Sequence, residues 1–371
     1  MTENKERSSS LVSFSYGPQH PGTHPYSLLL TVDGDRIEKV EAQIGYVHRG
    51  LAKQAESRTF IQALPIMERS CFIDSVNHQF GYVMAVEKLA GIEVPERAEY
   101  LRVIAAELSR MNSLISWFGG YAAETGINSA FMWAWKDREM FLDLFGHLAG
   151  SRVSVMYLTI GGVRWDWNDK LTNLTWEIID YMEERLKIHK KLVMKNSIFK
   201  KRTKGVGVVS KEKALEYAFT GPNLRASGVQ GDIRILEPYS VYDHFKFTPK
   251  VMTEGDNWAR TMIRLHDIET SMEILKQALP EIPEGEYKTK VPLKLRANAG
   301  EAYARVELSR GVMGYYIRTV EDKSTKPYRV KIRGPSFSHF QIVEDILVGT
   351  HMADIPIIKG SLDVCPADLD R

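Results

Sequence analysis

The sequence predicts a mainly helical α+β fold, in which small β-sheets flank a helix bundle. Two long stretches carry apolar residues alternately three and four positions apart, the spacing of one helix face. Their members are Leu101, Ile104, Leu108, Met111, Ile115 and Phe118, and then Trp258, Met262, Leu265, Ile268, Met272, Leu275 and Leu279. Strand-like segments lie at 11–16, 27–41, 301–307, 314–320 and 327–332. Helices and strands that are grouped separately along a chain are typical of α+β domains.

The chain divides into three parts. The polar residues 1–10 are predicted to form a disordered arm. Residues 11–45 form an N-terminal β-hairpin region, because Asp33-Gly34-Asp35 provides a turn between an apolar run and an alternating strand. Residues 46–371 form a helical body with small β segments. Its long helices are expected from Pro95 to Gly119-Gly120, from Leu171 to Met194, and from Trp258 to Pro280.

The composition is that of an ordinary soluble globular protein. Of 371 residues, 44% are apolar and 26% are charged, and a net charge of +2 gives no argument for nucleic-acid binding. Two cysteines provide no disulfide framework, which favours a location facing the cytosol. Residues 1–10 lack an apolar signal core, and the charge-free stretch 111–123 is too short to span a bilayer. We therefore expect a peripheral protein without a membrane span.

The two cysteines stand in matching contexts near opposite ends of the chain. The first segment runs from Cys71 to Asp74 and the second from Cys365 to Asp368, so each reads C-x-x-D. Two C-x-x-C pairs would offer four thiolates to a soft metal, whereas two C-x-x-D pairs offer two thiolates and two hard carboxylates. We interpret the match as the remnant of a metal site, and the predicted fold allows the two segments to meet.

These segments belong to a series of ordered motifs that covers nearly the whole chain after residue 11. Because of these motifs, the chain resembles the hydrogenase-large-subunit family, in the branch that contains the D-type (49-kDa-type) subunit of respiratory complex I. The motifs are GPQHPGTH at 17–24, IGYVHRGLAK at 44–53, VEKLAGIEVPERAEYLRVIAAELSR at 86–110, TGPNLRASGV at 220–229, KPYRVKIRGPSF at 326–337 and SLDVCPADLDR at 361–371.

The resemblance implies that the metal cluster of nickel–iron hydrogenases is absent. In those enzymes the first cysteine of each pair binds nickel terminally and the second bridges nickel to iron. The terminal positions match Cys71 and Cys365, but the bridging positions match Asp74 and Asp368. A carboxylate is a poor bridge to a low-spin iron, so we expect no bound metal and no hydrogenase activity.

In complex I, the emptied cavity of this subunit receives a quinone headgroup. The resemblance assigns the histidine donor to a quinone oxygen to His24, and the carboxylate paired with it to Glu124, in place of the usual aspartate. His20 also belongs to this acceptor-binding loop, where it can instead fix the loop by a hydrogen bond to the backbone. Quinone reduction takes two electrons and two protons, and an imidazole backed by a carboxylate can supply one proton.

Two positions depart from complex I. The tyrosine that donates to the other quinone oxygen falls on Phe72, which leaves the second proton donor open among Asp74, Cys71 and Cys365. A histidine close to the partner's terminal iron–sulfur cluster falls on Ser154, which suits a low-potential acceptor such as menaquinone or methanophenazine. The arginine beside that cluster is retained as Arg69, and its positive charge can favour the reduced cluster.

Several residues keep a structural interpretation beside the functional one. Cys71 and Cys365 can be inert buried thiols, a redox pair or contacts of an iron–sulfur cluster. Asp74 and Asp368 can repel each other and carry a proton, or each can form a salt bridge with an arginine such as Arg310. Glu124 can be a helix-end carboxylate without a catalytic role.

The sequence therefore predicts a core subunit of a membrane-bound, ion-translocating oxidoreductase on the cytoplasmic side of the membrane. Electrons from a 4Fe–4S cluster of a partner would reduce a lipid-soluble quinone or methanophenazine, with no cofactor held tightly by this chain. The implied partners are a B-type iron–sulfur subunit, a C-type subunit and an H-type membrane channel subunit. The electron donor stays open among NADH, deazaflavin and ferredoxin.

Two other functions remain alternatives. The C-x-x-D pattern also resembles the large subunit of archaeal membrane-bound sulfane reductases, which would use Cys71 and Cys365 on polysulfide. The other alternative is a non-catalytic scaffold for the iron–sulfur subunit. No G-x-G-x-x-G motif precedes a helix in a suitable context, so this chain is expected to bind no nucleotide.

Overall fold

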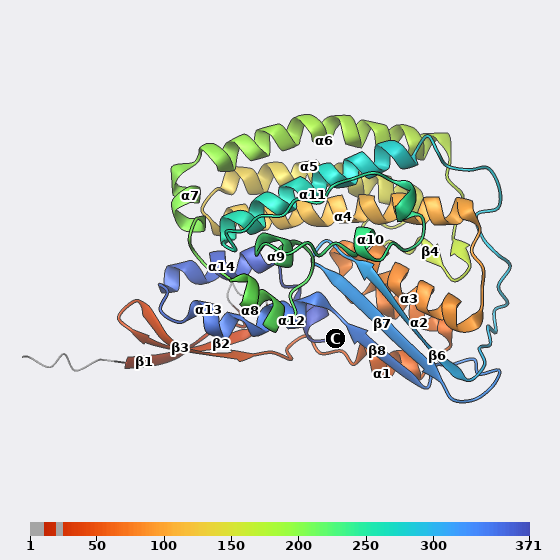
Figure 1. Ribbon diagram of the computed structural model, residues 1–371, viewed down its shortest axis with the longest axis horizontal. Coiled ribbons are helices and arrows are strands. Elements are labelled where there is room, and N and C mark those ends of the chain that lie inside the picture. The colour runs from red at the N-terminus through yellow and green to blue at the C-terminus, as the bar shows by residue number, and fades with distance from the viewer. Residues whose placement is uncertain (1–10, 20–24) are drawn as a thin grey trace, which may run out of the picture.

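Long helices form one side of the molecule and small sheets form the other (Figure 1). The computed structural model describes residues 11–19 and 25–371. The expectations for residues 1–10, His20 and His24 fall outside the described residues. The mainly helical α+β fold is confirmed, with three small antiparallel sheets among the described residues.

The N-terminal region is a three-stranded antiparallel sheet in the order β1-β2-β3. The strands are β1 (Leu11–Tyr16), β2 (Ser27–Asp33) and β3 (Arg36–Gln43). Gly34, at φ 65°, makes the tight turn between β2 and β3. Alternate β2 residues, Leu28 and Leu30 among them, are buried in one apolar cluster with residues of the segment 343–362, such as Ile355. The sheet thus packs against the C-terminal part of the chain.

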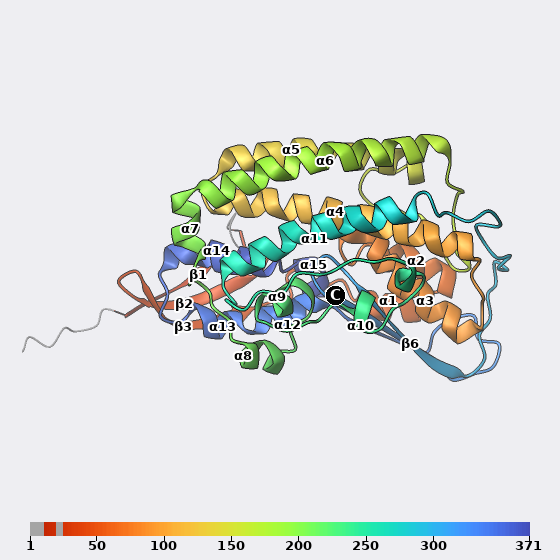
Figure 2. The same ribbon diagram turned by 45° about the horizontal axis from the view of Figure 1, so that its top comes forward.

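Four long helices pack together as the bundle (Figures 1 and 2). They are α4 (Glu96–Glu124), α5 (Asn128–Ala149), α6 (Asp169–Lys195) and α11 (Asn257–Ala278). The last two agree closely with the predicted ranges. Asn168 caps α6 and Asp256 caps α11, each by accepting a hydrogen bond from a backbone N–H of the first turn.

The predicted end of α4 at Gly119-Gly120 is wrong, because the helix continues to Glu124. Gly119 lies against α5, where an added Cβ would come within 3.0 Å of the Ala134 Cβ. The glycine therefore permits close helix packing and does not terminate the helix. The additional turn carries Tyr121 and Glu124 to the candidate site.

A second three-stranded sheet packs against α3 (Ser75–Ala90). Its antiparallel strands are β6 (Gly300–Glu307), β7 (Val312–Thr319) and β8 (Arg329–Arg333), close to the predicted segments. Before α3 come α1 (Leu51–Glu56) and α2 (Phe60–Glu68), the latter with a complete capping box at Thr59. The tight β6–β7 turn places residues 308–311 beside the C-x-x-D segments.

The remaining elements are short. The helices are α7 (Ser197–Thr203), α8 (Lys211–Glu216), α9 (Gly221–Ala226), α10 (Ile233–Leu236), α12 (Pro335–Gln341), α13 (Val343–Leu347), α14 (Ile355–Leu362) and α15 (Pro366–Leu369). The others are the strands β4 (Leu158–Thr159) and β5 (Gly162–Val163) and the 3-10 helices η1 (Phe72–Asp74), η2 (Tyr242–His244) and η3 (Met352–Asp354). Among the described helices, none has the length and hydropathy needed to cross a bilayer.

The C-terminal residues lie inside the body of the molecule (Figures 1 and 2). Asp370 Oδ2 accepts a hydrogen bond from the Val47 backbone N–H at 2.8 Å, and its carbonyl oxygen lies 2.6 Å from His48 Nδ1. These contacts hold α15 next to the chain segment between β3 and α1. Cys365 is thereby brought to the start of η1.

Candidate functional site

The two C-x-x-D segments meet, and their thiols form a buried pair. Cys71 immediately precedes η1 and Cys365 immediately precedes α15. Both cysteines are free and buried, and their side chains hydrogen-bond to each other. Arg310, from the β6–β7 turn, donates from Nη1 to Cys71 Sγ at 3.1 Å. Two chain segments almost 300 residues apart thus place two sulfur atoms and one guanidinium together.

The electrostatics of this thiol pair favour one thiolate. The hydrogen bond with Cys71 lowers the pKa of Cys365 to about 7, against the opposite effect of burial. The same hydrogen bond, together with burial, raises the pKa of Cys71. The positive charge of Arg310 favours a thiolate at both sulfurs. These effects favour a thiolate at Cys365 over one at Cys71, and the thiolate is the nucleophilic form of a cysteine.

The Asp74 carboxylate is occupied by neutral hydrogen-bond donors. Oδ1 accepts from Asn77 Nδ2 at 2.7 Å and from Ser109 Oγ at 3.0 Å. Oδ2 accepts from the backbone N–H and the Oγ of Ser309, both at 3.0 Å. These bonds tie η1 to α3, α4 and the β6–β7 turn. Asp74 is fully buried and does not line the cavity described below.

Asp368 and Asp74 accept hydrogen bonds from different donors. Their contacts therefore give no support to the mutual repulsion considered for the two aspartates. Asp368 Oδ2 accepts from the Ser336 backbone N–H at 3.0 Å, and its Oδ1 is buried without a partner. Among the described residues, Arg310 forms its ion pair with Asp363, at 3.1 Å, and with neither C-x-x-D aspartate. No three His, Cys, Asp or Glu side chains of residues 11–19 and 25–371 form a group that could hold a metal ion.

A cavity of about 250 Å³ opens beside the thiol pair. It lies between η1, the C-terminal half of α4, the start of α5, and the segment from α14 to α15. Its walls are mostly aromatic or apolar, with polar groups at a few positions. The lining residues are Phe72, Ile73, Ser116, Trp117, Gly120, Tyr121, Glu124, Trp135, Arg310, Gly360, Asp363, Val364, Cys365 and Pro366. Such a lining suits a flat organic ring with a few polar atoms.

Glu124 forms part of the cavity wall and pairs with a lysine that the sequence patterns did not reveal. Lys359 Nζ donates to Glu124 Oε1 at 3.2 Å. Burial raises the pKa of Glu124 and lowers that of Lys359, and each charge partly offsets the shift of the other. Glu124 Oε2 lies so close to Gly360 that an added Cβ would come within 1.9 Å of it. A glycine at position 360 is therefore needed for this placement of the carboxylate.

Phe72 and Arg69 lie at the surface next to the cavity. Phe72 lines the cavity and is 51% exposed. Arg69, whose side chain is 53% exposed, pairs with the buried Glu68 at 3.1 Å. Burial raises the pKa of Glu68 to about 7, against the effects of Arg69 and Arg164. A titratable buried carboxyl is therefore paired with an exposed cation here.

The structure brings together Phe72, Cys71, Cys365 and Glu124, but not Asp74 or Asp368. The sequence patterns revealed neither Lys359 nor the aromatic walls of the cavity. Trp117 and Trp135 were not recognisable as wall residues, because they stand in helix patterns that are typical of ordinary core. The available signal for Lys359 was its position as a single charge within the apolar run of α14. Arg225, which belongs to the motif at 220–229, forms a buried bidentate pair with Asp267 at 2.7 and 2.9 Å.

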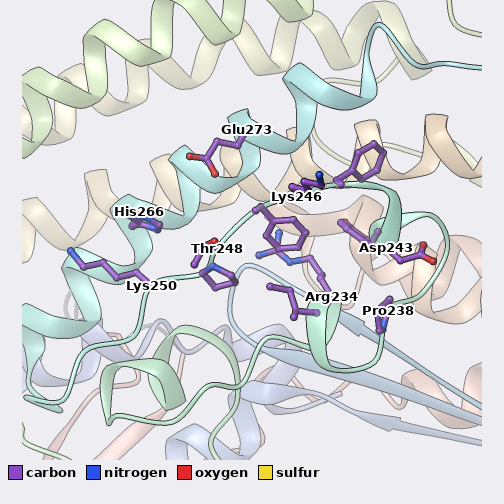
Figure 3. Close-up of a pocket in the computed structure, with 13 residues that line it drawn as sticks. Arg234, Pro238, Asp243, Lys246, Thr248, Lys250, His266 and Glu273 are labelled. Atoms are coloured by element: carbon purple, nitrogen blue, oxygen red, sulfur yellow. The ribbon is translucent and has the colours of Figure 1, made fainter.

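A larger groove of about 820 Å³ lies elsewhere, between α11 and the loop that follows α10 (Figure 3). Lys246 and Lys250 from the loop, and His266 and Glu273 from α11, are among its lining residues. Among the described residues, none of the sequence-predicted site residues lines this groove, whereas Phe72, Glu124 and Cys365 line the smaller cavity beside the thiol pair.

The chain is similar to known proteins over its length. Residues 124–298 and 289–371 match the family model described as the 49 Kd subunit of respiratory-chain NADH dehydrogenase. The D-type subunit of NADH-quinone oxidoreductase from Desulforamulus reducens is 42% identical over 95% of this chain and 96% of that protein. Its counterpart from Clostridium beijerinckii is 41% identical over the full length of both.

Similarity also extends to a solved structure. A chain in the structure of the membrane-bound sulfane sulfur reductase, an archaeal respiratory membrane complex, is 39% identical to this one. The two chains superpose with a TM-score of 0.94 over 97% of this chain and 98% of the other.

Proposed function

Because this chain belongs to the family of the 49-kDa subunit of respiratory-chain NADH dehydrogenase, we propose that it reduces a membrane quinone or methanophenazine. It is a core, D-type subunit of a complex I-related membrane oxidoreductase, and the resemblance found in the sequence is confirmed. Its oxidoreductase activity is exerted as part of a multi-subunit respiratory complex. The identity of the acceptor and the roles of single residues are our proposal.

The cavity supports this acceptor class. Its walls include Phe72, Trp117 and Trp135, which can hold a planar ring by aromatic contact. Glu124 stands in one wall, and Cys365 and Arg310 in another, so polar atoms of a ring system can find partners. The cavity is small, which suits a headgroup whose apolar tail extends out of it.

Electrons would arrive from a 4Fe–4S cluster held by a B-type partner. The exposed surface at Arg69 and Phe72 supports a docking site there, because it adjoins the cavity and carries a cation that favours a reduced cluster. The start of α5 exposes Met132, Trp133 and Trp135 next to the cavity. This apolar surface supports contact with an H-type membrane subunit that completes the acceptor channel. A C-type subunit and coupled ion translocation complete the proposed complex.

Within this cavity, His24 would orient and protonate the acceptor with the help of Glu124. The described residues on either side of the loop 20–24 support this placement. Burial raises the pKa of Tyr16, which precedes the loop, and that of Tyr26, which follows it; the charge of Glu124 adds to both shifts. Both flanks of the loop therefore lie close enough to Glu124 to sense its charge.

Polysulfide is the second candidate acceptor, and the thiol pair is the observation that favours it. The Cys365 thiol, with a pKa of about 7, lines the cavity, and its thiolate can attack a sulfane sulfur. The similar chain of the archaeal sulfane sulfur reductase adds to this argument.

Replacing both Cys71 and Cys365 by serine distinguishes the two acceptors. Serine retains a hydroxyl but gives no thiolate, so polysulfide reduction by the purified complex should fall below detection. Quinone or phenazine reduction should stay within about threefold of the unmodified rate, because the cavity walls remain. Assembly of the complex, followed by size-exclusion chromatography, serves as the control. Loss of both activities in an assembled complex would contradict the proposal, because it would show that reduction of the organic acceptor also depends on the thiols.

A further inference from the structure

We propose that Lys359 and Glu124 form the proton-supplying pair of the acceptor cavity. Glu124 contacts the acceptor, and Lys359 acts through Glu124. The inference rests on the proposed function, and it addresses the proton donor that Phe72 cannot provide. Asp74 is a poor candidate for this role, because all four of its hydrogen bonds come from neutral donors that hold the fold together.

The burial of Lys359 requires an explanation. Its side chain is 1% exposed, on a helix whose neighbouring residues are apolar. Removing an ammonium group from water carries a large desolvation cost, which a single ion pair rarely offsets. An isoleucine or methionine would fit such a position at lower cost. A buried charge of this kind is therefore more often retained for chemistry than for stability.

Hydrogen-bonding capacity is left over around this pair. Within residues 11–19 and 25–371, the Lys359 ammonium donates to Glu124 Oε1 alone. Glu124 Oε2 is buried without a partner, and so is the hydroxyl of Tyr26. The Lys359 Nζ lies 6.0 Å from the centre of the Tyr26 ring. The two side chains that interact with Lys359 thus each have an unsatisfied polar atom, as expected where a ligand or bridging water completes the network.

The proton affinities of the two groups converge. Burial raises the pKa of Glu124 and lowers that of Lys359, so a proton moves between Nζ and Oε1 at a smaller cost than in water. Among the described residues, three tyrosines face the pair: Tyr121 from α4, Tyr16 from β1 and Tyr26 before β2. Arg260 from α11 adds a positive charge next to Tyr121.

The resulting proton transfer is balanced by the electrons of the iron–sulfur partner. After the acceptor receives two electrons, Lys359 passes a proton from Nζ to Glu124 Oε1, and the resulting carboxyl gives a proton to a reduced oxygen or nitrogen of the ring. An N–H bond of Lys359 breaks, the O–H bond formed on Glu124 breaks in turn, and an O–H or N–H bond of the acceptor forms. Lys359 is left as a neutral amine, and a proton from water then restores the ion pair. The acceptor's second proton comes from another group.

Three variants of the purified complex test the pair. Lys359→Met keeps the length of the side chain and removes its proton. Lys359→Arg keeps the positive charge, but a guanidinium does not release its proton at working pH. Lys213→Met is the matched control, because Lys213 makes a 3.0 Å ion pair with Asp345 at the surface. Reduction of the partner's cluster is followed by electron paramagnetic resonance, and acceptor turnover with a short-chain quinone or phenazine.

Both Lys359 variants should lose about 100-fold in kcat with little change in KM, while cluster reduction and the Lys213→Met control stay normal. In Lys359→Met the alkaline limb of the residual rate should move to higher pH, because the cation that lowered the pKa of Glu124 is gone. In Lys359→Arg that limb should stay in place.

Two results would overturn the pair. One is full turnover in Lys359→Met with an unchanged pH profile. The other is full recovery of turnover in Lys359→Arg, which would make the lysine a structural cation. If the unmodified complex reduces neither quinone nor phenazine, the proposed function itself is overturned. This outcome differs from failure of the pair alone, in which the unmodified complex is active.

Discussion

A Gly120→Phe variant should assemble normally and lose at least about 100-fold of its turnover with a quinone or phenazine. Gly120 lines the cavity, and an added Cβ would meet no atom within 4 Å. The residue lies within α4, so no unusual backbone conformation opposes a larger side chain. A phenyl ring would occupy the space that we assign to the acceptor, and even small displacements of a reacting ring cost about 100-fold in rate. Turnover and thermal stability are measured on the same purified complex.

The control for this variant is Gly146→Phe on α5. Gly146 is also helical, its Cβ would come no closer than 3.9 Å to the Arg152 side chain, and it does not line the cavity. Replacing a helical glycine should stabilise either helix by up to about 1 kcal/mol, so stability should not separate the two. Normal turnover in an assembled Gly120→Phe complex would show that the acceptor binds elsewhere.

The second large effect is on stability. An Asp74→Ala variant should lower the free energy of unfolding by about 4 kcal/mol, because the donors of Asn77, Ser109 and Ser309 would stay buried without an acceptor. Chemical denaturation, followed by tryptophan fluorescence, measures this loss.

Asp345→Ala provides the comparison. This surface carboxylate pairs with Lys213 and Tyr217, and its removal should cost less than about 1 kcal/mol. If Asp74→Ala retained full stability but lost acceptor reduction, the carboxylate would be the proton carrier that the sequence left open.

Periodicity predicted much of the fold, because apolar spacing and cap residues act locally. The predicted ranges of α6 and α11 agree closely with the structure, and the strand-like segments after residue 300 correspond to β6, β7 and β8. The end of α4 could not be predicted in this way. Whether Gly119 ends a helix or admits a neighbour depends on α5, which packs against it only in the folded chain.

The candidate site was predictable to the extent that single residue types carry it. Cys71 and Cys365 stand out in the sequence, whereas Glu124 was assigned by the family resemblance. In the structure Cys365 and Glu124 line one cavity, and Cys71 is hydrogen-bonded to Cys365. The role of Asp74 was not predictable, since its donors come from elements up to 235 positions away. Lys359 was missed because its partner, Glu124, is equally distant in the chain.

The most direct test is an electron cryo-microscopy structure of the complete complex with a quinone or phenazine analogue bound. Our account predicts density for the ring between Phe72, Trp135 and Cys365, with a polar atom of the ring next to Glu124. A ring bound in the groove between α11 and the loop after α10, with the smaller cavity empty, would contradict it.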